Sequence, residues 1–257
     1  MQLSKFSSFA QETKTILCFG IDPKTNKEIE NYFSEITDKL IFEQQISAIK
    51  PNYAYFAQYG FEGLEALKKL IDRYKNRIPI ILDGKRGDIG KSSEAYANEI
   101  YDVWGADATT ISPYMGEDSV KPFLRDGKIA YVLCRTGNKG ANDFQDLKIG
   151  KKYLYEIVAE KAVKWDCGLV VGATSDAIKR IVKITKNKLP LLVPGIGTQG
   201  GDLDMVLNEI KGNIAIHRVN TSSSIAYAYE KQGGSTNASE AALKEAKKLN
   251  EKIRSYF

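Results

Sequence analysis

Histidine is almost absent from this chain of 257 residues, which contains only His217. A single imidazole excludes a metal site built from several histidines, and it argues against a catalytic triad that uses histidine as its base. His217 lies inside the apolar run 214–219. We therefore expect it to be a structural residue.

Cysteine is also scarce, and long hydrophobic runs are missing. Cys18, Cys134 and Cys167 lie far apart without CxxC spacing, and the first two sit inside apolar runs. This pattern indicates buried free thiols in a reducing compartment. No run of about 18 apolar residues and no signal-peptide pattern occurs. We therefore expect a cytoplasmic protein that neither spans a membrane nor is exported.

Concentrated positive charge is the third feature that the chain lacks. It has 37 basic and 32 acidic residues, for a net charge of +5. No block of lysine and arginine is interleaved with aromatic residues, as a nucleic-acid-binding surface would require. We expect no nucleic-acid partner, and the mild basic excess fits a small anionic ligand.

Short apolar runs alternate with helical patterns along the whole chain. The eight candidate strands are 15–21, 46–50, 78–84, 107–112, 129–135, 168–173, 189–194 and 213–219. Amphipathic patterns at 61–71 and 176–185 predict helices between strands, and a last helix follows Ser235-Thr-Asn237. Continuous apolar strands separated by helices indicate a parallel sheet.

No linker or repeat divides the chain, so we predict one α/β domain over residues 1–257. A (β/α)8 TIM barrel fits eight such units, and a doubly wound open sheet is the alternative.

The most informative segment is 83–90, Asp-Gly-Lys-Arg-Gly-Asp-Ile-Gly, which follows the apolar run 78–82. The two-residue period of a strand sends Asp83 and Lys85 to the same face, and Asp88 follows in a glycine-bracketed turn. Burying such charges costs several kcal/mol per ion unless they pair. The segment therefore predicts a paired charge network, either catalytic or merely stabilising.

Other predicted strands also end in polar residues. These ends carry Asp22, Lys50, Thr136, Asn138, the glycine-rich stretch 195–201 and the stretch 220–224. Active sites of (β/α)8 barrels form at the carboxyl ends of the strands, and phosphate commonly binds after the last two. Backbone N–H groups of a glycine-rich loop approach an anion closely, and Gln199 adds an amide donor. We therefore predict a phosphate site there, and a lid formed by the long segment 136–150 after the fifth strand.

Lysines held among carboxylates suit a particular chemistry. Nearby negative charge keeps a lysine protonated, so it can stabilise a carbanion and then protonate it. A carboxylate placed beside a carboxylate of the substrate favours loss of the latter. The charged cluster is therefore typical of a decarboxylase.

At these residues the chain resembles the orotidine 5′-monophosphate decarboxylase family. It is most similar to the bacterial branch, the type 2 subfamily, whose motif is Asp-x-Lys-Arg-Gly-Asp-Ile-Gly. The resemblance runs in order through 18–23, 49–52, 83–90, 136–138 and 193–201. It implies a homodimer of (β/α)8 barrels with active sites shared between subunits. The implied reaction converts orotidine monophosphate to UMP and CO2, the last step of de novo UMP biosynthesis, without metal or cofactor.

The resemblance also implies roles for the charged residues. Lys50, Asp83 and Lys85 form the network, in which Asp83 faces the substrate carboxylate and Lys85 protonates C6 of the pyrimidine. Asp88 completes the network from the partner subunit.

The remaining implied contacts bind the rest of the nucleotide. Asp22 and Lys50 hold ribose hydroxyls, with Ser92 contributed by the partner subunit. The pyrimidine and phosphate contacts come from Thr136, Gly137, Asn138, Gly195, Gln199, Gly200, Ser222 and Ser223.

Two positions depart from the family pattern. Gly137 stands where the family usually has serine or threonine, and Ser223 stands where it has a phosphate-binding arginine. A charge-assisted hydrogen bond contributes about 1.5–3 kcal/mol, so loss of that arginine predicts binding weaker by about one to two powers of ten. Arg218 is close in sequence, but the sequence does not fix the direction of its side chain on the strand.

Two other functions stay open at this point. One is a related barrel enzyme that acts on a sugar phosphate with Mg2+, which needs additional carboxylate ligands. The other is a barrel that binds nucleotides without catalysis, because of Gly137 and Ser223.

Overall fold

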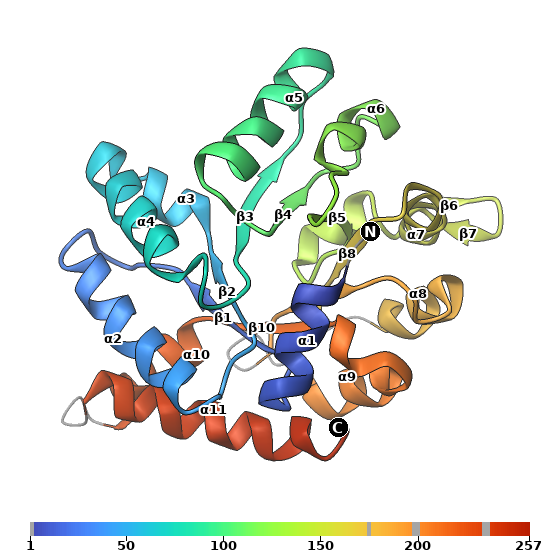
Figure 1. The fold of residues 1–257 in the computed structure, drawn as a ribbon. Coiled ribbons are helices and arrows are strands. Elements are labelled where there is room, and N and C mark those ends of the chain that lie inside the picture. Colours follow the sequence, from blue (N-terminus) through green and yellow to red (C-terminus); the bar gives the residue numbers. More distant parts are fainter. Residues whose placement is uncertain (1–2, 174–175, 197–200, 233–236) are drawn as a thin grey trace.

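Eight parallel strands form a closed barrel in the computed structural model, which describes residues 3–173, 176–196, 201–232 and 237–257 (Figure 1). The strands are β1 (Leu17–Ile21), β2 (Ala48–Pro51), β3 (Ile81–Arg86), β4 (Ala108–Ile111), β5 (Ile129–Arg135), β8 (Gly168–Val171), β9 (Leu191–Pro194) and β10 (Arg218–Thr221). Their order is β2-β1-β10-β9-β8-β5-β4-β3. Parallel bridges from Ile49 to Ile80 and from Asn52 to Asp83 join the two ends of this order. The TIM barrel is confirmed, and the open-sheet alternative is wrong.

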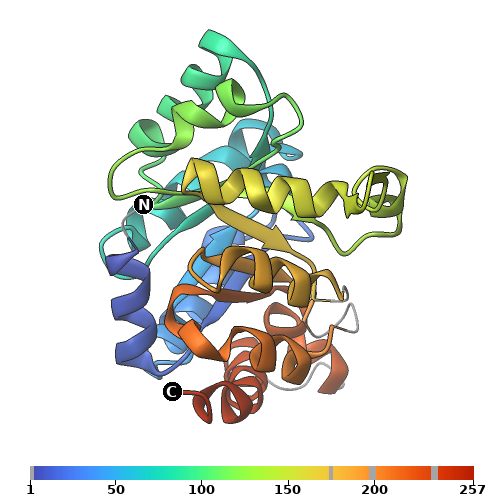
Figure 2. The same ribbon diagram turned by 90° about the vertical axis from the view of Figure 1, so that its right-hand side faces the viewer.

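Helices surround the barrel, as Figures 1 and 2 show. The α-helices are α1 (Ser4–Thr13), α2 (Ile29–Phe42), α3 (Tyr53–Ala57), α4 (Gly60–Tyr74), α5 (Gly90–Asn98), α6 (Glu117–Val120), α7 (Leu154–Trp165), α8 (Ala177–Thr185), α9 (Leu203–Ile210), α10 (Ser223–Ala226) and α11 (Ala238–Arg254). The predicted helices 61–71 and 176–185 correspond to α4 and α8. α11 begins after Asn237, whose side-chain oxygen accepts hydrogen bonds from two backbone N–H groups of its first turn. Within the described residues, no helix combines the length and apolar character needed to cross a membrane.

One predicted strand is displaced. Residues Lys211–Ile216 form the 3-10 helix η4, and β10 begins only at Arg218, although 213–219 was the predicted strand. Ile214 and Ile216 are buried, and η4 packs against α1 and α9. Their apolar character therefore reflects burial beneath helices and not a place in the sheet.

The segment 136–150 contains more regular structure than its sequence indicates. It includes the 3-10 helix η3 (Lys139–Asp143) and the short strand β6 (Lys148–Ile149), which pairs with β7 (Lys152–Tyr153). In Figure 2 this segment lies beside one end of α7. Its predicted action as a lid remains a prediction.

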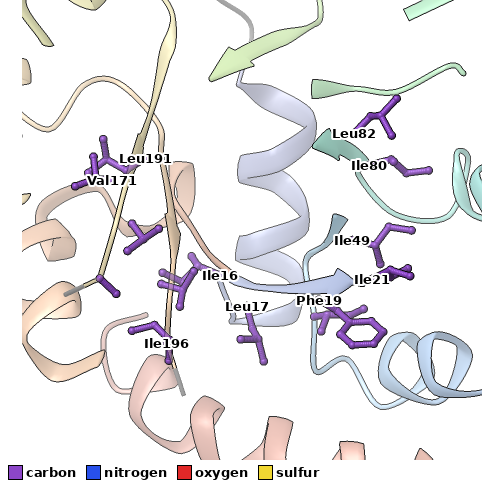
Figure 3. Close-up of a cluster of buried hydrophobic side chains, with 14 of the residues drawn as sticks. Ile16, Leu17, Phe19, Ile21, Ile49, Ile80, Leu82, Val171, Leu191 and Ile196 are labelled. Atoms are coloured by element: carbon purple, nitrogen blue, oxygen red, sulfur yellow. The ribbon is translucent and has the colours of Figure 1, made fainter. Parts of the chain in front are cut away.

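The strands separate two apolar layers. Inward-facing residues of the strands form the inner cluster together with Phe6 of α1; the strand members are Cys18, Ala48, Ile81, Ala108, Ile129, Tyr131, Val170 and Leu192. Alternate residues, such as Phe19, Ile49 and Leu82, face the surrounding helices in the outer cluster (Figure 3). This alternation is the two-residue period of a strand. It sends the next inward positions, at the carboxyl ends of the strands, into a pocket.

All three cysteines are buried and free, as predicted. His217 is buried as well, and its Nδ1 accepts a hydrogen bond from the backbone N–H of Leu191 at 3.1 Å. This contact ties β9 to the residue before β10 and supports the structural role predicted for the histidine.

Candidate active site

A pocket of about 540 Å³ lies at the carboxyl ends of the strands. Its size is that of a small-molecule site. The predicted site residues that line it are Asp22, Lys50, Asp83, Lys85, Thr136, Gly137, Asn138, Gly195, Ser222 and Ser223. Asn220 also lines it and lies in the predicted polar stretch 220–224, whereas Lys24, Asn52, Tyr55, Thr110 and Tyr227 line it without having been assigned a role. Gln199 and Gly200 fall outside the described residues.

Asp83 is the centre of the charge network. Its Oδ2 accepts a hydrogen bond from Lys50 Nζ at 2.7 Å, and its Oδ1 accepts one from Lys85 Nζ at 2.6 Å. The Thr110 hydroxyl donates a third, to Oδ1, at 2.7 Å. The side chains of Lys50 and Asp83 are only 4% and 7% exposed, whereas that of Lys85 is 49% exposed. Lys85 is therefore the member of the network that a molecule in the pocket can reach most easily.

The network fixes the charge of its buried members. Burial alone would raise the pKa of Asp83, but the adjacent ammonium groups of Lys50 and Lys85 outweigh it and hold that pKa well below its usual range. Burial alone would lower the pKa of Lys50, but the carboxylates of Asp83 and Asp22 raise it above its ordinary value. The floor of the pocket thus holds an ionised carboxylate and an ionised lysine.

The backbone at Lys85 is strained. Its φ of +42° lies in the left-handed region, and the pairing of β3 with β4 shifts register between Leu82 and Arg86. Such a conformation costs about 1–3 kcal/mol in a residue other than glycine. The Lys85 N–H donates to the Thr110 hydroxyl at 3.0 Å, which holds this conformation.

Arg86 holds the end of β3 in place on the other side of the register shift. Its guanidinium donates two hydrogen bonds of 2.9 Å to the carboxylate of Glu99, which begins the π-helix η1 (Glu99–Val103). It also lies over the rings of Tyr53 and Tyr96. The arginine of the motif is therefore a support for the strand end.

Asp88 and Ser92 are separate from this pocket. Neither is among the residues that line it, and Ser92 is exposed on α5. Asp88 Oδ1 accepts a hydrogen bond from the N–H of Ile89 at 2.8 Å. The prediction that both reach the pocket of a partner subunit stays a prediction.

Two buried oxygen atoms of the pocket have no hydrogen-bond partner among the described residues. They are Oδ1 of Asp22, after β1, and Oδ1 of Asn220, on the neighbouring strand β10. A buried polar atom without a partner is costly, so such atoms mark places where a ligand donates a hydrogen bond. Ribose hydroxyls are donors of this kind.

The loop after β5 is held in place by its own side chains. Gln145 Oε1 accepts a hydrogen bond from the Thr136 N–H at 2.7 Å, and its amide nitrogen donates to the Thr136 hydroxyl at 3.0 Å. The Thr136 hydroxyl in turn lies 2.6 Å from Asn138 Oδ1. Arg135 forms a bidentate pair with Asp146, at 2.9 and 2.8 Å. The predicted pyrimidine-contacting residues thus belong to an organised loop.

The pocket also borders the segments predicted to bind phosphate. Gly195 has a φ of +102°, a conformation that favours glycine, and its carbonyl accepts the N–H of Gly201 at 3.1 Å. Arg218 does not reach this region. It is fully buried and donates to the carbonyls of Phe6, Ala215 and His217. Arg218 therefore cannot replace the arginine that the family pattern has at position 223.

Comparison with known proteins places these features in a family. Residues 15–251 match the model of the orotidine 5′-phosphate decarboxylase / HUMPS family. Orotidine 5′-phosphate decarboxylase of Herpetosiphon aurantiacus is 41% identical, over 96% of this chain and 95% of its own length. The enzyme of that name from Janthinobacterium sp. (strain Marseille) is 39% identical, over 98% of both chains. The structure of Leishmania donovani OMP decarboxylase is 36% identical, with a TM-score of 0.84 over 99% of this chain and 100% of that one.

Proposed function

The chain belongs to the orotidine 5′-phosphate decarboxylase / HUMPS family, and we propose that its pocket decarboxylates orotidine 5′-monophosphate to UMP in pyrimidine biosynthesis. The observation that carries this proposal is the network of Lys50, Asp83 and Lys85 at the floor of the pocket. A carboxylate held ionised beside a half-exposed lysine is what loss of CO2 followed by protonation requires.

The proposed step uses charge that is already in place. The carboxylate on C6 of the pyrimidine lies beside ionised Asp83, and the bond from C6 to the carboxyl carbon breaks. CO2 leaves, and the electron pair stays on C6, where the ammonium of Lys85 stabilises it. Lys85 then donates a proton to C6, giving UMP, and regains a proton from water.

The rest of the nucleotide fits the remaining walls of the pocket. We propose that the ribose hydroxyls donate to the unpartnered oxygen of Asp22, with Lys50 beside it. The pyrimidine would contact Thr136, Gly137 and Asn138. The phosphate would bind where Gly195, Ser222 and Ser223 line the pocket, together with Gln199 and Gly200.

The Mg2+-dependent alternative requires further carboxylate ligands near Asp83. The described residues include no group of three or more His, Cys, Asp or Glu side chains that could hold a metal ion. Both oxygens of Asp83 already accept hydrogen bonds from lysines. The geometry of this site therefore favours decarboxylation that relies on the protein's own groups.

We further propose that two copies of the chain share their active sites, with Asp88 and Ser92 entering the partner's pocket. The surface beside Asp88 carries exposed apolar side chains, Ile89 at 56% and Met115 at 40%, and the Met115 side chain lies against Gly87. Apolar groups exposed together mark interaction surfaces.

Subunit mixing tests the shared site. Dimers of Asp88→Ala and Lys85→Ala chains would contain one intact site each, so mixing two inactive variants should restore activity. Mixed dimers that form and stay inactive would contradict a shared site.

Turnover of orotidine monophosphate by the purified wild-type protein tests the proposed reaction. Loss of the orotate ultraviolet absorbance, with UMP as product and a chelator present, is the expected result. Turnover that stops with the chelator would favour the metal-dependent alternative. UMP binding without any turnover would favour the non-catalytic one.

A further inference from the structure

We propose that Lys24 binds the phosphate of the substrate, in place of the arginine that the family pattern has at the position of Ser223. This inference rests on the proposed function. A phosphate dianion needs a cationic partner or several converging donors. The lysines that line the described pocket are Lys24, Lys50 and Lys85, and both Lys50 and Lys85 are bound to Asp83. Lys24 is the lysine of the three that lies outside this network.

Lys24 is held close to the predicted phosphate region through Tyr227. The backbone N–H of Lys24 donates to the Tyr227 hydroxyl at 3.1 Å, and that hydroxyl donates to the carbonyl of Asp22, also at 3.1 Å. The ammonium of Lys24 lies 3.9 Å from the centre of the Tyr227 ring.

Tyr227 in turn follows directly after α10. Its N–H donates to the carbonyl of Ser223 at 3.0 Å, so the two residues are one helical turn apart. One turn advances the chain by about 6 Å, which is within the reach of an extended lysine side chain. The ammonium of Lys24 is therefore placed to reach an anion at Ser222 and Ser223, which line the same pocket.

Glu230 is the partner that a phosphate would displace. Its two carboxylate oxygens accept hydrogen bonds from Lys24 Nζ at 2.8 and 2.9 Å. Both side chains are 48% exposed, and pairs this exposed contribute little free energy. A phosphate dianion in the pocket offers Lys24 more negative charge than Glu230 does, so an exchange of partners is favourable.

The test compares a ligand that has the phosphate with one that lacks it. For Lys24→Ala we expect UMP to bind about 10- to 100-fold more weakly, the loss of one charge-assisted hydrogen bond, while uridine binds as it does to the wild type. Lys27→Ala is the matched control, because Lys27 is exposed on the same segment but does not line the pocket. Titration calorimetry measures both ligands, and Lys27→Ala should leave both affinities unchanged.

Two further variants test the contact between Lys24 and the phosphate, so that the inference does not depend on Lys24→Ala alone. Ser223→Arg, introduced into Lys24→Ala, should restore UMP affinity because it returns a cation to the same anion. Glu230→Gln should strengthen UMP binding severalfold without changing uridine binding, because Lys24 is then released from its partner.

Several results would overturn the inference. Equal losses of UMP and uridine affinity in Lys24→Ala would show a structural role. A UMP affinity that is unchanged in Lys24→Ala, or that falls in Glu230→Gln, would exclude the phosphate contact. A wild-type protein that binds no UMP would instead refute the proposed function itself. The two failures are therefore distinguishable.

Discussion

Replacing Thr110 by valine removes one hydroxyl from the network and keeps the shape of the side chain. That hydroxyl donates to Asp83 Oδ1 at 2.7 Å and accepts the N–H of Lys85 at 3.0 Å. It thus orients the carboxylate and also holds the strained backbone from which the Lys85 side chain extends. The residue is buried, so water does not easily replace the lost contacts.

The size of the effect follows from these two contacts. A hydrogen bond to a charged group contributes about 1.5–3 kcal/mol. If the orientation of Asp83 and Lys85 acts mainly in the transition state, the same free energy appears as a fall in kcat of about 10- to 150-fold. We expect KM for orotidine monophosphate to change much less, because Thr110 acts on the reacting groups.

Thr109→Val is the matched control for this variant. Thr109 is the preceding residue of β4 and is equally buried, but its hydroxyl donates to the carbonyl of Leu82 at 2.8 Å and it does not line the pocket. Both variants should lose some thermal stability, and only Thr110→Val should lose turnover. Equal kcat values for the two variants would refute the role assigned to Thr110.

Two other predictions follow from the barrel. Burial lowers the pKa of His217 to about 3, so below pH 6.5 the unfolded chain binds a proton that the folded chain does not. Folding stability should therefore be fully present above pH 6.5 and fall by about 1.4 kcal/mol per pH unit below it. Denaturant unfolding between pH 7 and 5 measures this slope, which should flatten in His217→Asn; an unchanged slope would contradict it. In Gly172→Ala the new Cβ would lie 2.5 Å from the backbone nitrogen of Gly137, so the loop after β5, which is proposed to contact the pyrimidine, must move. KM for orotidine monophosphate should rise, and steady-state kinetics with an unchanged KM would show that this loop is not a binding surface.

The sequence predicted the barrel and the charged strand end because both depend on local periodicity. The two-residue period placed Asp83 and Lys85 on one face, and the structure shows both on one side of β3. Apolar character could not separate a strand from η4 at 213–216, since both are buried. Thr110 was missed because threonine is common in strands for steric reasons, although its inward position at a strand end was a usable signal.

Contacts between segments far apart in the chain could not be predicted from the sequence. Lys24 and Glu230 are 206 residues apart, and nothing in either segment indicates that they meet. The left-handed backbone conformation of Lys85 could not be predicted either, because glycine rather than lysine usually indicates such a conformation. Only the assembled fold shows such features.

Turnover by Lys85→Ala, measured beside the wild type, tests the central claim most directly. Both proteins should unfold cooperatively and bind UMP, which establishes that the pocket is intact. We expect the wild type to convert orotidine monophosphate to UMP and Lys85→Ala to form none, because the carbanion has then lost both its stabilising charge and its proton donor. Wild-type turnover in Lys85→Ala would contradict the proposed mechanism.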